Sequence, residues 1–284
     1  MTIPFKANLD GKVAVVTGGG GVLGAYFSKA LAESGAKVAI LDLHQEPADK
    51  VAAEINEAGG KAVGIAANVL DKESLEAARA IVEKELGTCD ILLNGAGGNN
   101  PKGTTDDEYY NAEAVKNNPE LKTFFDLDPK SVGFVFDLNF LGSLLPSQVF
   151  GKGMTEKKGC NIINVSSMNA YTPLTKIPAY SGAKAAISNF TQWLAVYMSK
   201  TGVRVNAIAP GFLVTKQNEK LLLNEDGSYT ARAQKIINST PMERYGQPEE
   251  LVGAILFLAD EKAASFISGV VLPIDGGFSS YAGV

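Results

Sequence analysis

Tyr180 and Lys184 stand four residues apart in a stretch typical of the start of a helix. Residues at this spacing project from the same helix face, so the two side chains could act together. For tyrosine to exchange a proton near neutral pH, its pKa must fall from about 10 to about 7, a preference of roughly 4 kcal/mol for the phenolate. A neighbouring ammonium or another positive group favours that charged form. Alone, the pair is not specific, because this spacing is also common among exposed surface residues.

A hydroxyl pair, Ser166 and Ser167, directly follows the apolar run 161–165, which predicts a buried strand. A hydroxyl at the end of such a strand can hydrogen-bond a reacting carbonyl and polarise it. A purely structural hydroxyl is the alternative. His44 is the only histidine, which excludes a histidine-based triad or a multi-histidine metal site elsewhere in the chain. We therefore predict carbonyl chemistry without a metal.

A glycine-rich segment, residues 17–24, follows the first predicted strand and leads into a helical stretch that reaches about residue 34. Glycines let the backbone turn sharply and approach a pyrophosphate, and the helix N-terminus offers free N–H donors. A turn without a ligand is the simpler alternative. The predicted cofactor contacts in this segment are Gly18, Gly20, Gly21, Val22 and Leu23.

Asp42 lies at the end of the second predicted strand, about 20 residues beyond the glycines, where a carboxylate can accept hydrogen bonds from an adenosine ribose. The same charge would repel a 2′-phosphate, and no arginine follows in the next few residues. We therefore expect NAD rather than NADP. The alternative for Asp42 is a turn residue or a helix cap.

Short apolar runs alternate with longer helical stretches along the chain, which predicts a doubly wound α/β layout with a mostly parallel sheet and helices on both faces. No break in this alternation suggests a boundary, so residues 1–284 are predicted to form one domain. Two long loops, at about 98–128 and 216–240, follow strand ends on the side where ligands bind in such sheets. The predicted strands are 13–16, 38–41, 62–66, 91–93, 161–165, 203–209 and 269–274.

The overall charge is modestly acidic, with a formal net charge of −5. This argues against a nucleic-acid or anionic-membrane partner. No apolar run approaches transmembrane length and no signal peptide is recognised, so cytoplasmic residence is expected. The two cysteines, Cys89 and Cys160, lie beside strand-like runs and are expected to be buried thiols.

Taken together, these motifs resemble the short-chain dehydrogenase/reductase family over nearly the whole chain. The resemblance implies a Rossmann-type fold in which Tyr180 is the general acid/base and Ser167 orients the carbonyl. It also implies that Lys184 lowers the pKa of the tyrosine and holds the ribose, and that Asn139 holds a water in a proton relay. The matching residues are Thr17, Gly18, Gly24, Asn94 to Gly97, Asn139, Ser167, Tyr180, Lys184, Pro210 and Gly211.

The same resemblance implies further cofactor contacts and a homo-oligomer, either a tetramer or a dimer. Asp275, Gly276 and Gly277 match a segment that lies near the subunit interface in tetrameric members. Three positions depart from the family pattern, namely Val22, Gly95 and Asn68. The further cofactor contacts implied are Asn68, Val69, Asn94, Ala96, Gly97, Pro210, Gly211, Val214 and Thr215, in addition to Tyr180 and Lys184.

Several separate segments are similar to a subgroup of that family, the D-mannonate oxidoreductases, also called fructuronate reductases. This likeness implies that NADH and NAD support the interconversion of D-fructuronate and D-mannonate. Amide and ammonium groups suit such a polyhydroxylated acid, and the predicted substrate contacts are Asn99, Lys102, Asn169 and Lys216.

Other functions stay open at this point: a gluconate or polyol dehydrogenase, a 3-oxoacyl carrier-protein reductase, or a nucleotide-binding redox sensor without turnover. The acidic run Asp106 to Glu108 argues against docking of an acidic carrier protein, and we expect it to be a solvated surface.

Overall fold

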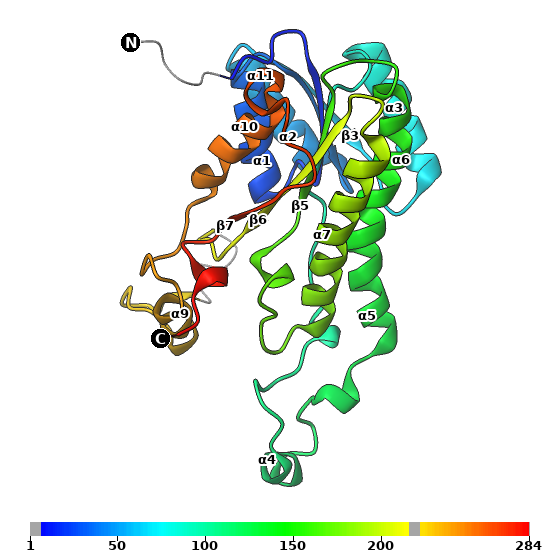
Figure 1. Cartoon of the computed structure of the whole chain (residues 1–284). Coiled ribbons are helices and arrows are strands. Elements are labelled where there is room, and N and C mark those ends of the chain that lie inside the picture. The colour runs from blue at the N-terminus through cyan, green and yellow to red at the C-terminus, as the bar shows by residue number, and fades with distance from the viewer. Residues whose placement is uncertain (1–6, 216–221, 284) are drawn as a thin grey trace.

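A seven-stranded sheet forms the centre of the computed structural model, which describes residues 7–215 and 222–283 (Figure 1). Its strand order is β3-β2-β1-β4-β5-β6-β7, and all six neighbouring pairs are parallel. The predicted doubly wound sheet is therefore confirmed. The strands are β1 (Val13–Thr17), β2 (Lys37–Asp42), β3 (Lys61–Ala66), β4 (Ile91–Asn94), β5 (Asn161–Val165), β6 (Arg204–Pro210) and β7 (Val271–Ile274).

Helices cover both faces of this sheet. One apolar core joins side chains of β1 to β6 to α3 (Lys72–Glu85), α6 (Gly142–Met154) and α7 (Pro178–Met198). A second core lies on the opposite face, under α1 (Val22–Glu33), α2 (Gln45–Glu57) and α10 (Val252–Ala259). Successive β2 residues alternate between the two cores, as the pleat of a strand buried on both faces requires. Cys89 and Cys160 are buried thiols in the first core, as predicted.

The longest apolar helical segment, Pro129–Met154, is long and apolar enough to cross a membrane by length and composition alone. This segment differs from the prediction that no apolar run approaches transmembrane length. This segment consists of α5 (Pro129–Phe136), the π-helical turn η3 (Asp137–Leu141) and α6. Its α6 portion packs on α3, β4 and β5, so it is a core helix of this fold.

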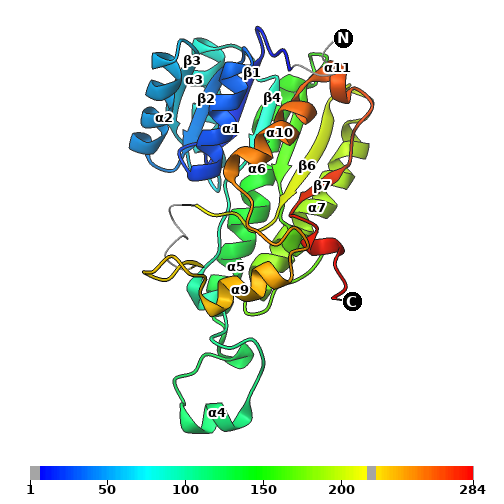
Figure 2. The ribbon, with the colours of Figure 1, turned by 90° about the vertical axis from the view of Figure 1, so that its left-hand side faces the viewer.

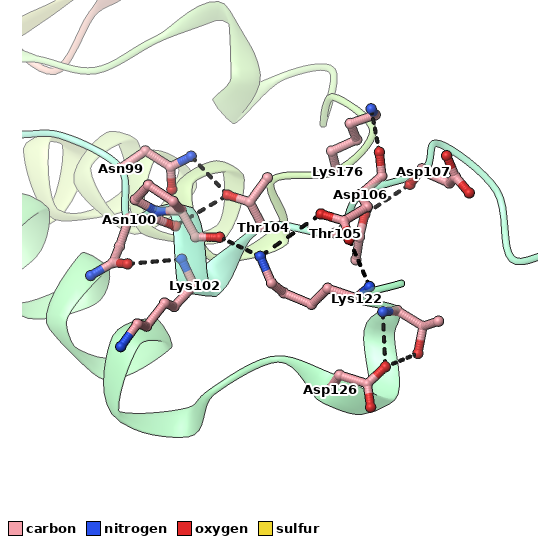
Figure 3. A network of polar contacts seen from close by, with 12 residues as sticks. Asn99, Asn100, Lys102, Thr104, Thr105, Asp106, Asp107, Lys122, Asp126 and Lys176 are labelled. Atoms are coloured by element: carbon pink, nitrogen blue, oxygen red, sulfur yellow. Dashed lines mark hydrogen bonds and ion pairs between the residues drawn. The ribbon is translucent and has the colours of Figure 1, made fainter. Parts of the chain in front are cut away.

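The predicted loop at 98–128 is an arm that extends away from the sheet, with α4 (Ala112–Asn117) at its far end (Figure 2). Short 3₁₀ turns η1 (Pro101–Gly103) and η2 (Phe124–Asp126) lie nearer its base. Hydrogen bonds fix that base to the loop before α7. The N–H of Thr105 donates to the Lys176 carbonyl, and the Lys176 ammonium donates to the Asp106 carbonyl (Figure 3).

The C-terminal part adds α9 (Ala231–Asn238), which lies beyond the carboxyl ends of the central strands, on the same side as the start of α7 (Figures 1 and 2). The remaining elements are the 3₁₀ turns η4 (Met168–Ala170), η5 (Pro248–Leu251) and η6 (Phe278–Ser280) and the short helix α11 (Glu261–Ala264).

Candidate active site

The carboxyl ends of the parallel strands lie at one edge of the sheet. Many of the residues predicted from the sequence to bind cofactor or to react lie at this edge. The chain order reverses between β1 and β4, which is the place where open α/β sheets bind ligands. The glycine-rich turn follows β1, and Gly95 and Ala96 follow β4. The two segments are fastened together because the Thr17 hydroxyl oxygen accepts hydrogen bonds from the N–H groups of Gly95 and Ala96, at 3.1 and 3.2 Å.

A cavity of about 390 Å³ opens beside β5 and β6. This volume lies within the usual range for small-molecule sites. Both predicted reactive hydroxyls, those of Ser167 and Tyr180, are in its wall. The described residues that line it are Leu23, Val165, Ser166, Ser167, Tyr180, Pro210, Gly211, Phe212, Leu213, Thr215, Leu222, Arg232, Ile236 and Tyr245.

Tyr180 lies in the first turn of α7, which starts with Pro178, a residue favoured at that position because its missing N–H would have no partner there. Its side chain lines the cavity together with that of Ser167. Burial raises the pKa of Tyr180, and the Ser167 hydroxyl lowers it in part. The protein alone therefore does not produce the lowered pKa that the sequence analysis anticipated. A positive charge beside the phenol, such as the Lys184 ammonium or a bound oxidised nicotinamide ring, favours the phenolate.

Lys184 is one turn further along α7 and is almost fully buried. Its ammonium donates a hydrogen bond of 2.8 Å to the Val165 carbonyl and lies 5.6 Å from the centre of the Tyr180 ring. Burial lowers its pKa to about 8. A Cβ built on Gly97 would be 3.2 Å from this ammonium and 2.7 Å from the Asn139 side-chain oxygen. Glycine at position 97 thus leaves room where Lys184 and Asn139 approach the cofactor edge.

The π-helical turn η3 presents Asn139 to this cluster. The side-chain amide nitrogen of Asn139 donates to the carbonyls of Val135 and Gly98, at 2.8 and 2.7 Å. Val135 provides the carbonyl that the backbone N–H of residue 139 would meet in a regular α-helix. The side chain therefore satisfies the carbonyl that the bulge would leave unpaired, and it fixes the start of the arm at Gly98. Isolated π turns commonly mark functional sites.

The glycine turn depends on close backbone approach. Gly18 has a φ of +63°, which L side chains rarely adopt. A Cβ on Gly24 would lie 2.2 Å from the Gly18 carbonyl oxygen, so only glycine lets the start of α1 pack on this turn. Gly21 precedes α1 and no side chain caps the helix. The first N–H groups of α1, beginning at Val22, are thus oriented to meet an anion.

Asp42 ends β2 beside the same turn. Its carboxylate accepts a hydrogen bond of 3.1 Å from the Gly20 N–H. The predicted acid and the predicted glycine loop therefore meet, as a ribose site next to a pyrophosphate site requires.

Other predicted cofactor residues divide into exposed and buried positions. Asn68 is exposed after β3, whereas Val69 is buried. Asn94 is also buried, and its amide donates to Ser147 and Asn164 at 3.0 and 2.8 Å, so the side chain joins β4 to its neighbours. The N–H of Val214 donates to the Gly246 carbonyl at 3.0 Å.

The predicted substrate residues are not brought to the cavity wall. Asn99 and Lys102 are exposed at the base of the arm, where the Asn99 amide donates to Thr104 and the Lys102 ammonium projects away from the neighbouring polar groups (Figure 3). Asn169 is buried beside Ser167, and its backbone N–H donates to the Ser167 hydroxyl at 3.2 Å. Lys216 lies outside the described residues.

Several cavity residues were not predicted from the sequence, above all Arg232 and Ile236 of α9. Their spacing of four, in a segment that alternates apolar and polar residues with helical period, was a usable signal. The loop predicted at 216–240 is therefore wrong in part, because α9 lies within it.

Comparison with known proteins gives a consistent match. The short-chain dehydrogenase family model matches residues 12–226. An uncharacterized oxidoreductase from Haemophilus influenzae is 60% identical over 100% of this chain and 99% of its own length. The uncharacterized oxidoreductase UxuB of Bacillus subtilis is 51% identical over 99% of this chain and 100% of its own.

A solved structure agrees with these matches. The crystal structure of a candidate D-mannonate oxidoreductase from Haemophilus influenzae, with NAD bound, superposes with a TM-score of 0.94. It is 60% identical to this chain, and the match covers 98% of each.

Proposed function

This chain belongs to the short-chain dehydrogenase family, and we propose that it is an NAD-dependent oxidoreductase that interconverts D-fructuronate and D-mannonate. Family membership makes it an enzyme that acts on CH–OH groups and the corresponding carbonyls. The observation that carries the chemistry is that the Ser167 and Tyr180 side chains lie together in the wall of the cavity.

The residues present suit NAD. The uncapped start of α1 and the close approach of Gly18 and Gly24 leave a cradle for a pyrophosphate, and Asp42 stands where an adenosine ribose would lie. The residues that would hold the cofactor also include Asn68, Val69, Ala96, Gly97, Pro210, Gly211 and Thr215. The bound cofactor supplies or accepts the hydride and brings a positive ring in its oxidised form.

In the direction of reduction, Ser167 donates a hydrogen bond to the carbonyl oxygen and polarises it. Tyr180 then gives its phenolic proton to that oxygen as the hydride arrives at the carbon, which yields the alcohol. Lys184, whose ammonium lies near the Tyr180 ring, stabilises the phenolate that remains. Asn139 positions the backbone at Gly98 beside this pair and supports a water-mediated return of the proton.

The substrate assignment rests on the likeness to the Haemophilus influenzae structure with bound NAD and on the segments that resemble the fructuronate reductases. We also expect the chain to act as a homo-oligomer, as the family resemblance implies.

The test is oxidation of NADH at 340 nm with D-fructuronate, run beside 5-keto-D-gluconate and an acetoacetyl thioester, each repeated with NADPH. Turnover with D-fructuronate and NADH alone supports the proposal. Turnover with only another carbonyl compound would refute the substrate and leave the reaction class in place.

A further inference from the structure

Helix α9 forms one wall of the cavity that contains the reactive hydroxyls. Arg232 and Ile236, one turn apart on this helix, both line the cavity. Residues spaced by four share a helix face, so one face of α9 is directed at the place where Ser167 and Tyr180 would hold a carbonyl.

The adjacent face of α9 fixes the helix to the body of the protein. Ala233 and Ile237 are buried in a small apolar cluster with Leu222 and Tyr245. The Tyr245 hydroxyl also donates a hydrogen bond of 3.2 Å to the Ala233 carbonyl. Because these contacts hold the helix against Leu222 and Tyr245, which also line the cavity, the position of Arg232 at the cavity follows from the packing of α9.

Arg232 provides the only positive side chain among the described residues that line the cavity, and none of those residues is acidic. Within the described ranges, the Arg232 side chain has no hydrogen bond or ion pair, whereas other cations nearby are paired. Lys235 on the same helix binds Glu108 at 3.0 Å, and Arg244 binds Glu250 at 2.7 Å. The guanidinium is therefore available to an anion that enters the cavity.

We propose that Arg232 binds the carboxylate of an acid substrate while Ser167 and Tyr180 hold its carbonyl. Guanidinium groups match carboxylates with two parallel hydrogen bonds, which fixes the orientation of the acid as well as its position. A linear sugar acid carries its ketone and its carboxylate at separate carbons, so two anchor points in one cavity select its direction. This inference rests on the proposed function, and it replaces Lys102 and Asn169 as the acid-binding groups.

The experiment compares Arg232→Met with Lys235→Met, which removes one positive charge from the same helix at a position outside the cavity wall. Each variant is assayed with D-fructuronate, with 5-keto-D-gluconate and with the uncharged ketose D-fructose, and NADH binding is followed by fluorescence titration. For keto acids, we expect kcat/KM of Arg232→Met to fall roughly 10- to 100-fold, the loss typical of a charge-assisted hydrogen bond. Activity with D-fructose and the Kd of NADH should stay unchanged, as should all values for Lys235→Met. Arg232→Lys should recover part of the loss.

Equal losses for acidic and uncharged substrates, a raised Kd for NADH, or unchanged kinetics would each overturn the role of Arg232. The substrate proposal is tested separately by the unsubstituted enzyme. If it reduces 5-keto-D-gluconate but not D-fructuronate, the proposed substrate is wrong and the same comparison still tests Arg232 with the other keto acid. If it reduces no acid at all, both proposals fail.

Discussion

Replacing Lys184 with methionine should abolish turnover and yet raise the free energy of unfolding at pH 7. Burial lowers the pKa of this lysine from 10.5 to about 8. Since each pKa unit corresponds to about 1.4 kcal/mol, keeping the buried ammonium charged at pH 7 costs about 3 kcal/mol relative to the unfolded chain. Methionine fills a similar volume without a charge. The substitution also removes the hydrogen bond from Lys184 to the Val165 carbonyl. This loss offsets about 1.5 to 3 kcal/mol of the stability gained by removing the buried charge.

The pH dependence of stability separates the effect of removing the buried charge from the effect of losing the hydrogen bond. Between pH 8 and 10.5 the unfolded chain binds a proton at this lysine that the folded chain does not, so the unsubstituted protein gains stability as pH rises through this window. The cost is fully present well below pH 8 and falls to about 1 kcal/mol at pH 9.5. The advantage of Lys184→Met should therefore shrink by about 2 kcal/mol between pH 7 and 9.5.

Urea unfolding followed by the fluorescence of Trp193, the single tryptophan, measures this difference at both pH values. Cofactor-free protein at one fixed concentration avoids effects of ligand and of assembly. Lys200→Met, at an exposed position just beyond the same helix, is the control and should stay within about 0.5 kcal/mol at both pH values. A stability difference for Lys184→Met that does not change with pH would refute the reasoning.

Four further predictions follow from the site and its surroundings. Tyr180→Phe should lose turnover at least about 100-fold while NADH still binds, as checked by kinetics and fluorescence titration. Unchanged turnover would indicate a binding protein rather than an enzyme. Asp42→Ser should raise the ratio of kcat/KM for NADPH to that for NADH at least about tenfold, because a charge that repels a 2′-phosphate is removed; a constant ratio would exclude that role. Gly24→Ala should raise the Kd of NADH at least about tenfold, since its Cβ would lie 2.2 Å from the Gly18 carbonyl oxygen and displace the turn. Tyr197→Asp, on an exposed α7 face where this ring stacks on Trp193, should lower the molar mass in light scattering if that face joins subunits, and an unchanged oligomer would place the interface elsewhere.

Local pattern was sufficient to predict the sheet and to single out candidate reactive residues. Apolar runs of strand length predicted the positions of all seven strands to within about two residues. The signal is most continuous in the inner strands, which are buried on both faces. The glycine turn, the Tyr180–Lys184 pair and Ser167 could also be recognised from the sequence. Each of these motifs lies within a single strand end or helix turn, so its spacing along the chain determines its local geometry. Those inferences depend on neighbours in the chain, which the sequence contains directly.

Tertiary structure alone decided which side chains surround the substrate and how the charges behave. Lys102 and Asn169 follow strand ends in the sequence, yet one is exposed on the arm and the other is buried behind Ser167. Arg232 comes from a segment more than 40 residues beyond the catalytic helix start, and only the packing of α9 brings it to the cavity. The raised pKa of Tyr180 and the lowered pKa of Lys184 likewise depend on burial. Desolvation is set by atoms from many distant segments at once, so no local spacing could have predicted it.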